Sequence, residues 1–172
     1  MVYVAANNHN DIRGKTVIDL GCGTGVLAIG AALMGAKHVV GVDIDDDAIA
    51  VAVRNAEAAG VDVEFVTGSI GCVGGKSDVV LMNPPFGAWK RGADVHFLDK
   101  ALEIAAVTYS LHKRSESSRE FLTHRIAQLG GRVDRVYEMT ILIPRMFDFH
   151  RHERYYVKAD LYRTVKRRNR MK

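Results

Sequence analysis

The chain passes through five strand-like segments, most of them followed by a helix-like segment, and ends in two strand-like runs with no helix between them. Apolar runs predict strands at 15–20, 38–44, 63–66, 78–82 and 107–111, and helical spacing predicts helices at 25–33, 46–59, 93–105 and 117–129. Such an order predicts parallel strands with helices on both faces. The last two runs, 133–143 and 155–164, predict an antiparallel hairpin at the sheet edge. The predicted fold is α/β, a Rossmann-like doubly wound seven-stranded sheet, mostly parallel, with one antiparallel strand near the C-terminus.

Length and composition fit one globular domain. The 172 residues, 48% hydrophobic and 26% charged, are expected to form a single domain over 1–172 with a basic tail at about 163–172. No apolar run approaches ~18 residues and the N-terminus lacks a secretory signal, so we expect a cytoplasmic protein. The two cysteines, Cys22 and Cys72, have neither CxxC nor metal-ligand spacing, so we expect reduced thiols and no metal site.

Charge is spread unevenly along the chain. Residues 1–82 hold 5 Lys and Arg against 10 Asp and Glu, residues 83–144 hold 9 against 7, and residues 145–172 hold 10 against 3. The later segments are therefore expected to face a polyanion. For the last ten residues alone, RTVKRRNRMK, a solvated tail explains the charge equally well.

A glycine-rich turn follows the first predicted strand, in the run Asp19-Leu20-Gly21-Cys22-Gly23-Thr24-Gly25. Alternate glycines let the backbone turn tightly and approach a ligand, and the next helix offers free N–H groups. Val26 stands at the position where a dinucleotide-binding GxGxxG loop prefers its third glycine. Asp19, an acid beside open backbone, suits a cationic or amino-bearing ligand better than a pyrophosphate. Asp43, at the end of the second strand, is placed to accept hydrogen bonds from ribose hydroxyls, with Ile44 against an adenine face. The acids at 45–47 are expected to cap the next helix.

The fourth predicted strand ends abruptly in Asn83-Pro84-Pro85-Phe86. The motif can be a simple strand terminator or a slot for a flat substrate. An exocyclic amine is a poor nucleophile because its lone pair is delocalised into the ring. An Asn side-chain carbonyl and a proline backbone carbonyl can each accept one N–H and aim the lone pair, while proline fixes the geometry and an aromatic ring stacks. The amide and the aromatic flanking the prolines favour the slot.

The two strand-end sites resemble those of S-adenosylmethionine-dependent methyltransferases with a Rossmann-like sheet, and N-P-P-[FY] resembles the signature of those that act on planar nitrogen atoms. The resemblance implies S-adenosylmethionine as the cofactor. Ser69 stands where Asp is common near the adenine amine, and Ile70 is expected to add apolar packing. By the same resemblance the cofactor residues are Asp19, Gly21, Cys22, Gly23, Gly25, Asp43, Ile44, Ser69 and Ile70, and the catalytic residues are Asn83, Pro84, Pro85 and Phe86.

The combination of NPPFG, YSLHK and a basic FHR segment resembles one family more closely, the archaeal and eukaryotic group that includes methyltransferase-like protein five. This resemblance covers about Val17 to Arg163 and implies methylation of adenine N6 in small-subunit ribosomal RNA. It also suggests a small zinc-binding activator protein that pairs along a sheet edge. Family members usually carry an N-terminal segment that covers cofactor and substrate, and this segment is expected to be missing here.

Basic residues with interleaved aromatics are the expected RNA-binding rim. Two of them follow the slot, three follow the fifth strand and the rest lie in the connection between the last two strands, near the aromatics Trp89, Phe147 and Phe149. For each one alone a solvated surface charge is the simpler interpretation, and the prediction rests on the cluster. The candidates are Lys90, Arg91, His112, Lys113, Arg114, Arg145, His150, Arg151 and Arg154.

Three alternatives remain open at the level of sequence. A glutamine-amide methyltransferase shares the planar nitrogen, but such enzymes usually show NPPY and an extra helical domain. A DNA adenine methyltransferase usually adds a target-recognition domain, for which 172 residues leave no room. A cofactor-binding or RNA-binding module without turnover is suggested by Ser69 and the short N-terminus.

Overall fold

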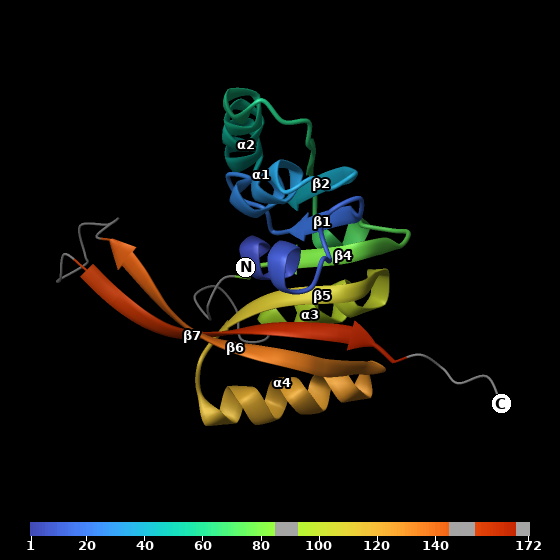
Figure 1. Ribbon diagram of the computed structural model, residues 1–172, viewed down its shortest axis with the longest axis vertical. Helices are drawn as coiled ribbons and strands as arrows, with labels where there is room; N and C mark the ends of the chain where they lie inside the picture. Colours follow the sequence, from blue (N-terminus) through green and yellow to red (C-terminus); the bar gives the residue numbers. More distant parts are fainter. Residues whose placement is uncertain (85–92, 145–153, 168–172) are drawn as a thin grey trace.

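The computed structural model describes residues 1–84, 93–144 and 154–167, which build one seven-stranded sheet with the order β3-β2-β1-β4-β5-β7-β6 (Figure 1). The strands are β1 (Thr16–Leu20), β2 (His38–Asp43), β3 (Glu64–Thr67), β4 (Ser77–Met82), β5 (Ala105–Lys113), β6 (Gly131–Pro144) and β7 (Arg154–Lys166). The helices are α1 (Val26–Leu33), α2 (Asp46–Ala59), α3 (Ala93–Ile104) and α4 (Glu116–Gln128), with single turns η1 (Val4–Asn8) and η2 (Ile70–Cys72).

The predicted fold class is confirmed. Strands β1 to β5 pair in parallel, and β7 pairs antiparallel with both β5 and β6. The reversed strand is therefore β7, which lies inside the sheet between its two antiparallel partners, and β6 forms the edge. The prediction of a hairpin at the sheet edge holds, with the second strand of the hairpin inserted next to β5.

Two apolar layers bury the two faces of the sheet. Alternate residues of β1 and β4 enter opposite layers, as the two-residue period of a strand requires. Helices α3 and α4 cover one face through residues such as Leu98 and Ile126, and Tyr162 of β7 lies in the same layer. The N-terminal segment and α1 cover the other face through Ile12 and Ala28. Because both faces are covered, the central strands are continuously apolar.

Local signals set several boundaries. Asp45 caps α2 by accepting hydrogen bonds from the backbone N–H groups of Asp47 and Ala48, which confirms the expected capping acid. Gly60 ends the helix in the left-handed conformation. The turn η1 was not expected, and only η2 stands between β3 and β4. Within the described residues, no helix is both long and apolar enough to cross a membrane.

Candidate cofactor and acceptor site

The carboxyl ends of β1, β2 and β4 lie at one level of the sheet. Leu20 pairs with Val42 on one side and with Met82 on the other. The next residues, Gly21, Asp43 and Asn83, therefore leave their strands side by side, on neighbouring strands about 4.8 Å apart. Ligands of doubly wound sheets bind beyond this edge, so the register assembles the glycine loop, the acid and the amide at a single site.

The glycine loop needs glycine for two different reasons. Gly21, Gly23 and Gly25 all have positive φ angles, of 71°, 51° and 84°. A Cβ on Gly21 would lie 2.8 Å from Cε1 of Phe97, and one on Gly25 would lie 3.0 Å from Cζ of Phe65. A Cβ on Gly23 would meet no described atom within 4 Å. The loop is thus packed from behind at its ends and open at its middle, where a ligand can approach the backbone.

Asp43 ties three loops together. Its Oδ2 accepts a hydrogen bond from the N–H of Gly23 at 2.7 Å, and its Oδ1 accepts one from the N–H of Asp45 at 3.1 Å. Its backbone carbonyl accepts from the N–H of Gly68, beyond β3, at 2.7 Å. Each carboxylate oxygen keeps a further lone pair. The side chain can therefore accept hydrogen bonds from a pair of hydroxyl groups while its position is fixed by the backbone.

Asp19 is the buried acid of the site. Its side chain is 1% exposed, and Oδ2 accepts a hydrogen bond from the N–H of Ala28 in α1 at 3.0 Å. No donor among the described residues reaches Oδ1. Burial raises the pKa of Asp19 to about 7, the Ala28 hydrogen bond opposes this, and the charge of Asp43 adds to it. A buried carboxylate oxygen without a partner fits a ligand that brings an ammonium group.

Cys22 and Ile44 have different environments from each other. The Cys22 thiol is buried, and burial raises its pKa to about 12, so it contributes packing rather than a reactive thiolate. The Cys22 backbone N–H donates to the carbonyl of Val42 at 3.1 Å, which holds the loop to β2. Ile44 follows Asp43 with its side chain 76% exposed. An exposed isoleucine beside the strand-end acid is available to pack against a flat ligand.

Ser69 and Ile70 lie after β3. The Ser69 hydroxyl accepts a hydrogen bond from the N–H of Gly71 at 3.3 Å and so caps η2. Ile70 is 7% exposed and packs in the layer beneath α3. In this arrangement Ser69 has a local structural partner, and most of the Ile70 surface is occupied by the core.

The acceptor residues are described only in part. Asn83 is exposed and Pro84 is buried directly after β4. Pro85 and Phe86 lie outside the described residues. The buried Met82, the last residue of β4, anchors the motif at the level of the glycine loop.

The expected RNA-binding residues that follow the fifth strand need a correction. His112 and Lys113 are the last residues of β5 itself. The His112 ring is buried and makes a T-shaped contact with the Tyr162 ring, at 5.7 Å between ring centroids, so it is not on the surface. Arg114 donates to Asp160 at 2.8 Å and to Glu138 at 3.0 Å. Because these acids engage it, only Lys113 of the three is an exposed cation.

The remaining basic candidates lie beyond what the structure describes. Arg154 begins β7, but its side chain is outside the described set. The others are wholly outside it: Lys90, Arg91, Arg145, His150 and Arg151.

Sequence reasoning did not single out the two aromatic rings behind the site. Phe97 of α3 lies against the glycine loop, and Phe65 of β3 lies against Gly25 and Gly41. A Cβ on Gly41 would be 2.7 Å from Cδ1 of Phe65. The signal was available, since an isolated glycine inside an apolar strand marks close packing.

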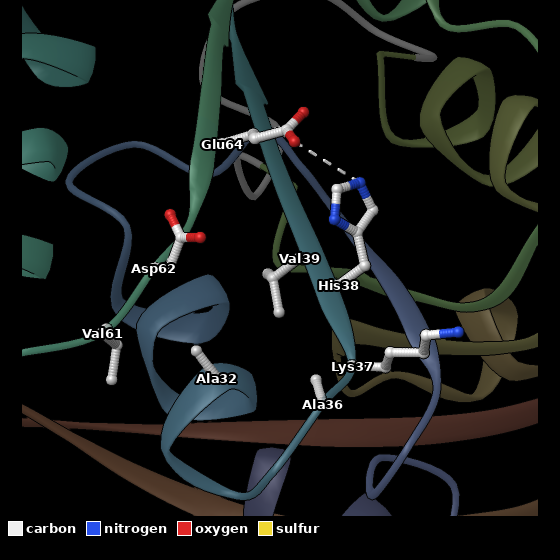
Figure 2. Close-up of a pocket in the computed structure, with 8 residues that line it drawn as sticks. All are labelled: Ala32, Ala36, Lys37, His38, Val39, Val61, Asp62 and Glu64. Carbon is white, nitrogen blue, oxygen red and sulfur yellow. Dashed lines mark ion pairs between the residues drawn. The ribbon is translucent and has the colours of Figure 1, made fainter.

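A separate hollow lies at the opposite edge of the sheet. Its volume is about 220 Å³, and Figure 2 shows two of its lining residues, His38 and Glu64, pointing toward each other, with Nε2 and Oε1 3.7 Å apart. These residues begin β2 and β3, so the hollow is at the amino ends of the strands, away from the ligand edge. In the part of the chain that is described, no three His, Cys, Asp or Glu side chains are grouped to hold a metal ion. The residues that line the hollow are Ala32, Ala36, Lys37, His38, Val39, Val61, Asp62 and Glu64.

The sheet order, the open glycine loop after β1 and the acid at the end of β2 define an S-adenosylmethionine-dependent methyltransferase with a Rossmann-like fold. Comparison with known proteins agrees. Residues 4–84 match the family model of the ribosomal protein L11 methyltransferase, PrmA. This match covers the cofactor half of the site and ends at Asn83 and Pro84.

Relatives that align with nearly the whole chain identify the family. The rRNA N(6)-adenosine-methyltransferase METTL5 of Danio rerio is 35% identical over 95% of this chain and 81% of its own length. The Drosophila melanogaster Mettl5 is 37% identical over 95% of this chain and 79% of its own length. The crystal structure of PH1948 from Pyrococcus horikoshii superimposes with a TM-score of 0.88 and 38% identity, over 96% of this chain and 81% of that chain. The chain belongs to the METTL5 family of rRNA N(6)-adenosine-methyltransferases.

Proposed function

We propose that the protein transfers a methyl group from S-adenosylmethionine to the N6 amine of an adenine in ribosomal RNA. The observation that carries this proposal is the register that sets Asn83 beside Gly21. The glycine loop and the amide leave adjacent strands, so a donor on the loop and an amine on Asn83 meet at the same edge. The METTL5 relatives support the choice of rRNA adenine as the acceptor.

The cofactor residues have complementary tasks. S-adenosylmethionine, when bound, supplies an electrophilic methyl on a sulfonium that leaves as a neutral thioether. Oδ1 of Asp19, which has no partner among the described residues, accepts a hydrogen bond from the ammonium group of the methionine end, and the open backbone at Gly23 lets that end approach closely. The remaining lone pairs of the Asp43 carboxylate accept hydrogen bonds from the ribose hydroxyls. The exposed Ile44 covers one adenine face.

The acceptor residues orient the amine. The Asn83 side-chain carbonyl and the Pro84 backbone carbonyl each accept one N–H, which draws the nitrogen out of the ring plane and aims its lone pair. Pro84 is buried, so its carbonyl is held by the core before substrate arrives. As the new N–C bond forms and the S–C bond breaks, the amine becomes acidic and releases its proton to water. Phe86 is the proposed stacking surface for the adenine ring.

Substitution at Asn83 tests the function. Asn83→Ala is expected to lower methyl transfer by about 10²–10³-fold, the effect of losing one preorganised hydrogen-bonding group, with cofactor affinity within about twofold of wild type. Asn7→Ala is the matched control, because Asn7 is also exposed and its side-chain amide donates a hydrogen bond to the nearby carbonyl of Tyr3. An Asn83→Ala protein with normal turnover would remove the amine-orienting role.

The substrate class is tested by locating the label. The protein is incubated with methyl-labelled S-adenosylmethionine and with separated ribosomal RNA, DNA and ribosomal protein, and the labelled RNA is digested to nucleosides. The expected product is N6-methyladenosine from RNA. Label in the protein fraction would instead support a glutamine-amide methyltransferase, and label in DNA would support a DNA adenine methyltransferase. Cofactor binding without label in any fraction would support a non-catalytic module.

A protein partner is also proposed. A small zinc-binding activator is the partner that the family resemblance suggests, and its pairing surface is a free strand of the sheet. The edge strand β3 suits this, since it pairs with β2 on one side alone among the described strands and carries Val66, which is 43% exposed. Co-expression with the activator should then raise the thermal stability of both proteins, and Val66→Asp should abolish the complex.

We place the activity in the cytoplasm.

A further inference from the structure

Strand β7 is longer than the neighbour it pairs with. Pairing between β5 and β7 ends at Lys113 and Ala159, whereas pairing between β6 and β7 continues to Pro144 and Arg154. Residues 140–144 of β6 and 154–158 of β7 therefore form a two-stranded arm, beside which the described part of the chain places no third strand. Figure 1 shows this arm projecting from the body of the molecule. Five residue steps at about 3.3 Å give it a reach of about 16 Å.

The arm leaves the sheet at the ligand edge. Strand β5 is parallel to β1 and β4, so its carboxyl end at Lys113 lies on the same side as Asp19 and Asn83. The arm begins where β5 ends. A long substrate that places one nucleotide at Asn83 must therefore continue either toward the arm or away from it.

The two faces of the arm differ in exposure. On one face Ile141 is half-buried and packs against the layer beneath the N-terminal segment, and its pairing partner Val157 is also half-buried. The opposite face is open: Leu142 is 48% exposed and its direct partner Tyr156 is 66% exposed. The next pair on the open face, Thr140 and Lys158, is exposed as well. Directly opposed side chains lie about 5 Å apart, so these four form one continuous surface.

The charges around this surface favour an anionic partner. At the root of the arm Asp160 accepts from Arg114 at 2.8 Å and from Arg119 at 2.7 Å, and Glu138 bonds both arginines. Two acids are thus balanced by two arginines. Of the described residues, none forms an ion pair with Lys158. The open face therefore presents a cation that no described acid pairs with, next to an exposed aromatic ring.

We propose that the open face of this arm, Thr140, Leu142, Tyr156 and Lys158, is a second RNA-contact surface that holds an unpaired nucleotide flanking the methylated adenine beyond its immediate neighbours in the RNA strand. Tyr156 stacks on the flanking base, Leu142 packs beside it and Lys158 contacts the adjoining phosphate. A reach of about 16 Å corresponds to about five stacked nucleotides at ~3.4 Å each. The inference rests on the proposed function, because it assigns a contact for the same substrate.

Binding and turnover are compared on two RNA probes. One is a trinucleotide centred on the methylated adenosine, which is too short to reach the arm, and the other is a 30-nucleotide RNA with the same centre. Tyr156→Ala should weaken binding of the long RNA by about 10-fold, as loss of one stacked base does, and leave trinucleotide turnover unchanged. Lys158→Ala should lower the slope of affinity against salt by about 1. Tyr156→Phe should bind the long RNA as wild type does.

Matched controls separate the arm from general effects. Tyr3 is 68% exposed and belongs to the N-terminal segment, and Lys15 is exposed at the amino end of β1. Tyr3→Ala and Lys15→Ala should leave long-RNA affinity unchanged. Cofactor titration and thermal unfolding of every variant confirm that each one is folded.

The outcomes are distinct. If the wild-type protein methylates no RNA, the proposed function itself fails. If it methylates RNA but Tyr156→Ala and Lys158→Ala bind the long RNA as tightly as wild type, the arm is not an RNA surface. Equal losses on both probes would also overturn the inference, because the trinucleotide cannot reach the arm. If both variants keep normal RNA affinity but lose a protein that co-purifies with the wild type, the arm is a surface for a protein partner instead.

Discussion

Replacing Asp19 by Asn should stabilise the protein without its cofactor and weaken cofactor binding, and both effects should depend on pH. Burial raises the pKa of Asp19 to about 7 from an ordinary value of 3.8. Because the folded pKa lies above the unfolded one, the folded protein holds this proton through the window from about pH 4 to pH 7. Stability therefore falls as pH rises through this window, and the full cost of the buried charge is present above it.

The size of the effect follows from the shift. About three pKa units at ~1.4 kcal/mol each correspond to about 4 kcal/mol of unfolding free energy at pH 8.5. An Asn side chain removes the charge and keeps a carbonyl for the N–H of Ala28, but it buries an amide N–H₂ at the position of Oδ1, where no described group accepts. Burying this unpaired amide N–H₂ lowers the free energy of unfolding by about 1–3 kcal/mol. The expected net gain is about 2 kcal/mol at pH 8.5, or roughly 4–8 °C in Tm for a chain of this size.

Thermal unfolding of wild type and Asp19→Asn at pH 5.5 and pH 8.5 measures this directly. The difference between the two proteins cancels the titrating groups that do not interact with Asp19, so it should be positive at pH 8.5 and near zero or negative at pH 5.5. A difference of the same size at both pH values would refute the reasoning. Calorimetric titration with S-adenosylmethionine should show wild-type affinity rising with pH toward 7, and a weaker, pH-independent affinity for Asp19→Asn.

Two further substitutions test the frame of the site. Asp43→Ala removes the acceptor for the N–H groups of Gly23 and Asp45 and should raise the Kd for cofactor at least 10-fold by calorimetry; unchanged affinity would exclude Asp43 from the ribose site. Gly41→Ala places a Cβ 2.7 Å from the ring of Phe65 and should lower unfolding free energy by about 1–3 kcal/mol in urea. A fully stable Gly41→Ala protein would show that the ring can move aside.

Elements with local signals could be predicted from the sequence, and those with distant partners could not. Helix α2 has its expected bounds because Asp45 and Gly60 lie next to its ends. The turn η1 has no such signal. It is followed by Asp11, which accepts from the Tyr109 hydroxyl at 2.6 Å and from Arg163 at 2.9 Å, 98 and 152 residues away. Contacts at that separation leave no pattern in a local window.

The candidate site divides in the same way. The glycine loop, Asp43 and Asn83 each follow a buried strand, so the strand order alone was enough to predict that they meet. Arg114 looked like a free cation because its partners, Glu138 and Asp160, come 24 and 46 residues later. Those partners meet it only because β7 inserts beside β5. The basic rim was therefore predictable as a charge excess and not as a set of individual contacts.

The strand order also turns the charge gradient of the sequence into a gradient in space. Strands β1 to β3 come from residues 1–82, which carry 5 basic against 10 acidic residues, and they lie on one side of β4. Strands β5 to β7 lie on the other side, and the described residues from Ala105 onward carry 11 basic against 5 acidic residues. Under the proposed function, an RNA strand with one nucleotide at Asn83 is expected to be repelled by the half of the sheet that holds the glycine loop and attracted to the half that carries the arm. The same division would separate Asp19, the proposed partner of the ammonium group, from the RNA phosphates, which would contact the C-terminal strands.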